Sequence, residues 1–97
     1  MVFSGRVAVK KVLETPAVLA FHHTRPFYPV HLVVVPKAHV PSLLEVGDVL
    51  LLELLGVVKH LSGDVLRRHG ACRVLTNLGA YQDSKHLHLH VIHGEPL

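Results

Sequence analysis

One stretch of this chain, residues 48–68, has the length and pattern of a long α-helix, and it limits how the rest can fold. Polar residues recur in it every three or four positions, and leucine and valine fill most of the others. Asp48 is placed to cap its start, and Gly70 is placed to end it. Its apolar face is wider than packing on one sheet requires. We expect either a homodimer that buries the helix on two sides, or a small-protein helix that is simply apolar.

The segments on both sides of this helix have the β-branched residues and turn signals of β-strands. We expect strands at residues 6–13, 17–21, 30–35, 72–77 and 85–94, with 30–35 central because it is the most apolar. Ser42 and Glu45 form a capping-box pattern that predicts a short helical turn. Strands before and after one long helix predict an α+β fold with a five-stranded, mainly antiparallel sheet. With 97 residues, the chain is expected to form a single domain, 1–97.

Three histidines alternate with apolar residues near the carboxyl end, in the run His86-Leu87-His88-Leu89-His90. Side chains of a strand alternate between its faces, so we expect the three imidazoles on one face and the leucines on the other. Same-face neighbours lie roughly 6.5 to 7 Å apart, close enough to converge on one small anion or metal ion. The loop before this strand is expected to carry Asn77, Gln82 and Ser84 toward the histidines.

Charge and cysteine content limit the partners of the chain. Lysines and arginines outnumber acidic residues ten to seven, and ten histidines add latent positive charge. This balance favours anionic ligands, or indicates no more than a generally basic protein. The basic residues are dispersed, which argues against nucleic-acid binding. The single cysteine, Cys72, excludes an internal disulfide. No signal-peptide core or membrane-length apolar run is present, so we expect a cytoplasmic protein without a membrane anchor.

Two chemistries suit three imidazoles on one strand: metal ligation and nucleophilic attack on phosphorus. Ligands from consecutive same-face positions of one straight strand are poorly placed for a tetrahedral metal site. A neutral imidazole needs only one nitrogen held as N–H by a carbonyl or a second histidine, and the other can then attack. A histidine-rich strand that merely faces solvent is the third interpretation. The pattern favours the nucleophile, with no metal and no cofactor.

The run His86-Leu87-His88-Leu89-His90-Val91-Ile92 is similar to the signature of the histidine triad superfamily, and the chain most resembles its Hint branch. Residues 19–22, residues 28–39 and Asn77 resemble family segments in the same order, so the resemblance covers roughly residues 14–94. It implies a HIT-like fold and homodimers. It also implies cleavage of a nucleoside phosphoramidate or related nucleotide anhydride without a required metal. The nucleotide part of this substrate would be an AMP-like purine nucleotide.

By this resemblance, His88 is the nucleophile that takes the nucleotidyl group as a covalent intermediate. His86 and His90 would orient it and contact phosphate oxygens. His22 would stand nearby, and Asn77 would contact the phosphate. Residues implied at the site with less definite roles are Glu14, at the family's ribose contact, and Gln82 and Ser84 in the loop before the triad. Asp83 competes with Ser84 for the phosphate contact, and the loop between Asn77 and His86 is shorter than in typical Hint proteins.

Two functions therefore remain open at this point. The first is a hydrolase or transferase that works through a nucleotidyl-histidine, and the second is a non-catalytic purine-nucleotide- or metal-binding protein on the same scaffold. A nucleoside monophosphate is expected to bind with its phosphate at His88 and His90, and with its base among apolar side chains near Phe3, Val7 or Phe21, because apolar pockets supply contact area. Zinc bound by all three triad histidines would instead favour the metal-binding alternative.

Overall fold

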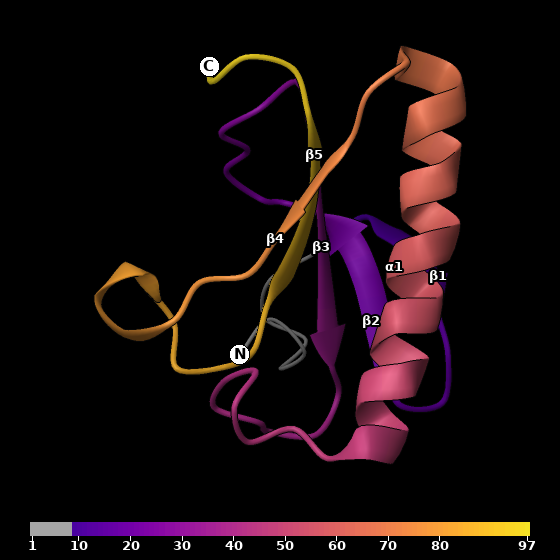
Figure 1. Ribbon diagram of the computed structural model, residues 1–97. Helices are drawn as coiled ribbons and strands as arrows, with labels where there is room; N and C mark the ends of the chain where they lie inside the picture. Colours follow the sequence, from indigo (N-terminus) through magenta and orange to yellow (C-terminus); the bar gives the residue numbers. More distant parts are fainter. Residues whose placement is uncertain (1–8) are drawn as a thin grey trace.

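In the computed structural model, residues 9–97 are described. Their elements are β1 (Lys11–Glu14), β2 (Val18–His22), β3 (Val30–Pro36), α1 (Asp48–His69), β4 (Arg73–Leu75), the 3-10 helix η2 (Gly79–Tyr81) and β5 (Leu89–His93). The strands form one sheet in the order β1-β2-β3-β5-β4, and every neighbouring pair is antiparallel. Helix α1 runs along one face of this sheet (Figure 1). The predicted α+β fold with five strands and one long helix is confirmed.

The helix begins and ends close to the predicted positions. Gly47 is the N-cap residue and contributes no side-chain hydrogen bond, so Asp48 lies in the first turn rather than at the predicted cap. Its carboxylate there still faces the positive end of the helix dipole. Gly70 ends the helix in the left-handed conformation, with φ of 82°, and its N–H donates to the Leu66 carbonyl at 2.8 Å. This C-terminal glycine is the cap that the sequence predicted.

Alternation along the strands divides the sheet into two faces. The face toward α1 carries a buried core, made by β2, β3 and β5 together with the helix; it includes Val18, Ala20, Leu32, Val34, Leu54, Val58, Leu61, Leu89 and Val91. The opposite face carries a smaller cluster of Leu19, Phe21, Val33 and Val35. Residues 31–36 of β3 are buried, because β3 has neighbours on both edges and contacts on both faces. Its central place is as predicted.

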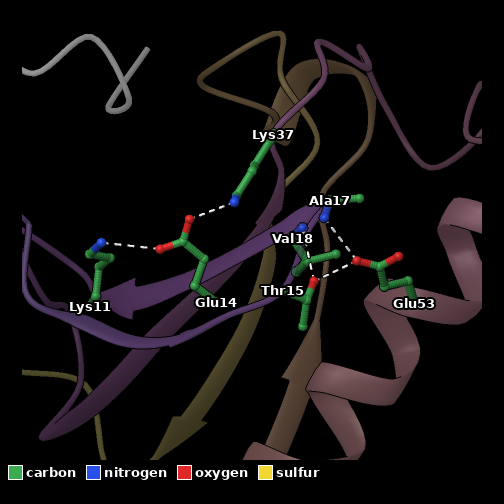
Figure 2. Close-up of polar contacts among 7 residues, drawn as sticks. All are labelled: Lys11, Glu14, Thr15, Ala17, Val18, Lys37 and Glu53. Carbon is green, nitrogen blue, oxygen red and sulfur yellow. Dashed lines mark hydrogen bonds and ion pairs between the residues drawn. The ribbon is translucent and has the colours of Figure 1, made fainter.

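A carboxylate on α1 fastens the turn between β1 and β2 to the helix (Figure 2). Glu53 accepts hydrogen bonds from the Thr15 hydroxyl at 2.5 Å and from the Ala17 N–H at 3.0 Å. The Thr15 oxygen in turn accepts the Val18 N–H at 3.1 Å. These bonds use the backbone donors of a turn that contains Pro16, so the helix is held against the start of β2 by polar as well as apolar contacts.

Several predicted elements take a different extent. Among the described residues, the strand predicted at 6–13 is seen at Lys11–Glu14, and the strand predicted at 72–77 is seen at Arg73–Leu75. Residues 43–45 form a turn rather than a helix, although its capping contacts are present: the Leu44 N–H donates to the Ser42 hydroxyl oxygen at 3.1 Å, and that hydroxyl bonds the Glu45 carboxylate. The strand predicted at 85–94 begins only at Leu89. His86 and His88 therefore precede the strand, which changes where His86 points.

Candidate active site

The site lies on the face of the sheet opposite α1, in a cavity of about 360 Å³ that we call the histidine cavity. Register places its residues together, since Leu75 of β4 pairs with His90 of β5, and His31 of β3 pairs with Ile92 of β5. The loop after β4 and the loop after β2 close its sides. The residues that line it are His23, Phe27, Tyr28, His31, Leu75, Asn77, Gln82, Asp83, Ser84, His88, His90 and Ile92.

The orientation of the His88 ring follows from its backbone partner. His88 Nδ1 lies 2.5 Å from the His86 carbonyl oxygen, and a carbonyl only accepts, so Nδ1 carries the hydrogen. In the neutral ring, Nε2 then keeps its lone pair. Burial lowers the pKa of His88 below 6.5, against the opposing effect of the bond to His86. The Thr76 hydroxyl holds the other side of this segment by donating to the His88 carbonyl at 2.6 Å.

A chain of three hydrogen-bonding groups sets the tautomer of His90. The Phe27 backbone N–H donates to His31 Nδ1 at 3.1 Å, so the neutral His31 carries its hydrogen on Nε2. That nitrogen lies 3.0 Å from His90 Nδ1 and donates to it. His90 therefore carries its own hydrogen on Nε2, as a donor for a ligand in the cavity. Burial lowers the pKa of His31 and of His90 to about 4, so both rings are neutral at pH 7.

His86 differs from the expectation that all three triad imidazoles share one face. Its side chain is 2% exposed and does not line the histidine cavity. Its Nε2 donates to the Pro36 carbonyl at 3.0 Å, and its Nδ1 lies 3.4 Å from His39 Nδ1. Burial lowers its pKa, so the ring is neutral and Nδ1 accepts from His39. Its ring is perpendicular to that of His88, because residue 86 precedes the strand and strand alternation does not govern it.

His22 was expected near the triad, but its neighbour His23 lines the histidine cavity instead. His22 continues the parity of Val18 and Ala20, which face α1, and it does not line the histidine cavity. It lines a second hollow with Lys10, His23 and Thr24. His23 lines the histidine cavity, with its ring 4.4 Å from that of His31 and 6.4 Å from that of His90 between centroids. The Arg25 N–H donates to His23 Nδ1 at 2.9 Å, so its Nε2 carries the hydrogen. Burial lowers the pKa of His23.

The predicted polar residues of the loop after β4 do meet the histidines. Asn77, Gln82 and Ser84 line the cavity, and so does Asp83, so both candidates for the phosphate contact are present. Gln82 Nε2 donates to the Pro41 carbonyl at 2.5 Å, which ties this loop to the segment after β3.

Glu14 and the residues expected around the base lie elsewhere or outside the described part. The Glu14 carboxylate bonds Lys11 at 3.1 Å and Lys37 at 2.5 Å, away from the cavity (Figure 2). Both lysines lower its pKa. Phe21 is 3% exposed in the smaller core cluster and does not line the cavity. Phe3 and Val7 lie outside the described residues.

Histidine, cysteine and acidic side chains are the usual protein ligands of metal ions. Within residues 9–97, no group of three such side chains is placed to hold a metal ion. Over the same residues, no helix has the length and apolar character to cross a membrane. His31, His23 and His39 were not singled out from the sequence, although His31 is a polar residue inside the most apolar strand, which is a usable signal.

Known proteins are similar to this chain in sequence and in fold. The family model of the HIT domain matches residues 5–97. A 13.2 kDa HIT-like protein of Azospirillum brasilense is 38% identical over 106 residues, covering 99% of this chain and 84% of that protein. A crystal structure of a HIT family hydrolase from Legionella pneumophila aligns with a TM-score of 0.80 at 30% identity, covering 94% of this chain and 86% of that one. A crystal structure of a hypothetical histidine triad nucleotide-binding protein from Sulfolobus tokodaii aligns with a TM-score of 0.87 at 30% identity, covering 99% of this chain and 69% of that one.

Fold and site together define an α+β protein with a cluster of neutral histidines on the open face of its sheet. The chain belongs to the HIT domain family, as the run of alternating histidines indicated.

Proposed function

We propose that this protein is a nucleotide hydrolase or transferase that cleaves a nucleoside phosphoramidate or related nucleotide anhydride through a covalent nucleotidyl-His88 intermediate. The observation that carries the proposal is the state of the His88 ring. Its Nδ1–H donates to the His86 carbonyl, its Nε2 keeps a lone pair, and His88 lines the cavity. A nucleophilic histidine needs this arrangement, with one nitrogen held and the other available. Hydrolase and nucleotide-binding relatives of the same fold support it.

The first step forms one bond and breaks one. His88 Nε2 attacks phosphorus, the bond from phosphorus to the leaving nitrogen or oxygen breaks, and its electron pair stays with the leaving atom, which takes a proton from solvent water. In the second step, water attacks phosphorus, the phosphorus–Nε2 bond breaks, and its electron pair returns to the imidazole. The proton lost by that water restores the one taken earlier. The His86 carbonyl stabilises the positive charge on the phosphorylated ring through Nδ1–H.

Other residues of the cavity have supporting roles in this proposal. The His90 Nε2–H donates to an oxygen on phosphorus, since the ring is neutral and its tautomer is fixed. Asn77 and Ser84 supply further donors beside His88. His86 acts as a positioning residue, because its carbonyl holds His88 while its ring is anchored on Pro36. The ligand is proposed to be a purine nucleotide, AMP-like.

A homodimer joined along α1 is part of the proposal. Val49 is 85% exposed and Leu52 is 72% exposed, both on the part of the helix that the sheet does not cover. Such apolar exposure on one helix is what a second copy of the chain would bury. Molar mass in solution, by light scattering, tests this. The cytoplasmic location stays a prediction.

Rapid quench of the protein with an adenosine phosphoramidate tests the mechanism. We expect the peptide that contains His88 to gain the mass of one adenylyl group, and His88→Ala to abolish turnover while AMP binding persists. His90→Ala should retain slow turnover, because removing one charge-stabilising group costs roughly 10²- to 10³-fold. Turnover by His88→Ala at the wild-type rate, or an adduct on another residue, would refute the covalent route. Binding of AMP without any turnover by the wild-type protein would leave the non-catalytic alternative.

A further inference from the structure

The histidine cavity has a polar end and an aromatic end. Asn77, Asp83 and Ser84 line it where the chain enters β5. The other end is lined by Phe27 and Tyr28, from the loop between β2 and β3, with Ile92 of β5 beside them. His88 and Ile92 are four residues apart, roughly 13 Å along an extended strand. The rings between the two ends form a continuous row, since the centroids of His88 and His90 lie 6.4 Å apart, those of His90 and His31 5.2 Å, and those of His31 and Phe27 5.9 Å. A substituent that extends from phosphorus at His88 past His90 therefore approaches the aromatic end.

The loop that carries the two aromatic rings is fixed before any ligand binds. The Phe27 N–H donates to His31 Nδ1, and the Phe27 carbonyl accepts the Leu97 N–H at 2.8 Å. At the loop's start, the His23 N–H donates to the His31 carbonyl at 2.9 Å. Both backbone groups of Phe27 are thus engaged, and a ligand pays little to order this wall.

The two rings present flat apolar surface to the cavity. The Phe27 side chain is 59% exposed although its backbone is fixed, and the Tyr28 ring meets His31 edge-on at 5.6 Å. Fully burying a phenylalanine side chain gains about 1.5–3 kcal/mol, so a ligand that covers Phe27 gains part of this. Planar groups gain about 0.5–1.5 kcal/mol more, because aromatic rings stack or meet edge-to-face.

We propose that Phe27 and Tyr28, the aromatic wall, bind a planar apolar leaving group, so that the preferred substrates are nucleotidyl compounds with an aryl or arylmethyl leaving group. His90 lies between His88 and Ile92 along the chain, and its Nε2–H is a donor in the part of the cavity between the phosphate and the wall. The wall leaves room for the nucleoside, because a second hollow, lined by Lys10, His22, His23 and Thr24, shares His23 with the histidine cavity. This inference rests on the proposed function and specifies its substrate.

The chemistry is that of the two steps given above. The leaving amine departs with the electron pair of the broken phosphorus–nitrogen bond and takes one proton from solvent water. The aromatic wall binds the ring of the leaving amine and donates no proton to it.

The test compares two adenosine phosphoramidates, N-benzyl and N-methyl, on the wild-type protein, Phe27→Leu and Tyr28→Leu. Leucine at position 27 keeps the backbone N–H that donates to His31. The readout is the ratio of kcat/KM for the benzyl substrate to that for the methyl substrate, because the change of this ratio between proteins cancels the intrinsic reactivity of the two amines. We expect each leucine variant to lower the ratio by roughly twofold to tenfold, the stacking gain of one ring. Leu44→Ala is the matched control, since this exposed residue lies in the turn 43–45 outside the cavity, and it should keep the wild-type ratio.

An unchanged ratio in both leucine variants would overturn the inference. If these variants also weakened AMP binding, the wall would hold the base instead of the leaving group. Failure of the proposed function is distinguishable from these outcomes. If the wild-type protein hydrolyses neither amidate, Kd values are measured for the two analogues in which CH₂ replaces the bridging nitrogen. A benzyl preference that Phe27→Leu lowers then supports the wall without catalysis, and equal Kd values in the wild-type protein refute it.

Discussion

Replacing His31 with phenylalanine should separate the orientation of His90 from the packing of the sheet. The ring is kept, but the two hydrogen bonds are lost, one at 3.1 Å from Phe27 and one at 3.0 Å to His90. Phe27 is exposed, so its N–H can turn to water, whereas His90 is half-buried and keeps an unsatisfied nitrogen. An unsatisfied buried group costs about 1–3 kcal/mol, and the free energy of unfolding in urea should fall by that amount.

Catalysis should suffer separately from stability. Without the donor from His31, the His90 ring can change tautomer and turn its lone pair toward the phosphate. We expect kcat/KM to fall roughly tenfold, about 1.4 kcal/mol, the size of one well-placed hydrogen bond. The pKa of His90 is lowered to about 4, first by burial and second by repulsion from His31. Removing His31 should therefore raise this pKa, and an NMR titration measures the change. Protonation of His90 would then begin closer to neutral pH.

A matched control is Val35→Ala, on the same strand and the same face but outside the cavity. It should lower stability and leave kcat/KM of the folded protein unchanged. If His31→Phe loses stability but keeps both kcat/KM and the His90 pKa, His31 is a packing residue only, and the orientation of His90 has another cause.

Three further predictions concern pH and the backbone. Because burial lowers the pKa of His88 below 6.5, its neutral form persists into mild acid, and kcat/KM should stay flat through pH 6.5 and decline only below it; a decline centred above 6.5 would contradict this. The pKa of Glu53 is lowered from 4.5, first by the Thr15 hydroxyl and then by the Ala17 N–H, so its contribution to stability is complete above 4.5 and is lost as the pH falls through the lower, folded-state pKa. Glu53→Gln should therefore lower the free energy of unfolding in urea at neutral pH, and much less in strong acid. An equal decrease at both pH values would show that the negative charge of Glu53 is not the cause. Gly94→Ala should cost at least about 1–2 kcal/mol by thermal unfolding, because φ is 97° and the added carbon would lie 2.8 Å from the Pro29 ring. Gly56→Ala, inside α1 with nothing within 4 Å of the added carbon, is the control and should not destabilise the protein.

Most of the fold follows from local patterns in the sequence. The helix was predicted within a residue of its observed end. The spacing of its polar residues and the terminating glycine, Gly70, are local signals that need no knowledge of the rest of the fold. β3 was expected at the centre because it is the most apolar of the strands, and such a strand needs neighbours on every side. The N-cap was misassigned, since Gly47 and Asp48 both suit a helix start and only the backbone decides between them.

The site was less predictable, because it depends on where strands begin. Strand alternation holds for His90, which lies inside β5, but not for His86, which precedes it and is buried against Pro36. The same dependence separates His22 from His23, where the parity of β2 and the turn after it decide which side chain enters the cavity. His31 required pairing information, because its partner His90 is 59 positions away in the sequence.

The hydrogen-bonded chain from Phe27 through His31 to His90 also determines where protons can travel. Its first member is a backbone amide, which is too weak an acid to pass a proton on, so the chain has a fixed direction and is closed at one end. His90 is thereby insulated from exchange through the protein interior. Protons for the leaving group must come through the open mouth of the cavity, and the solvent isotope effect on turnover should report water there rather than a relay of imidazoles.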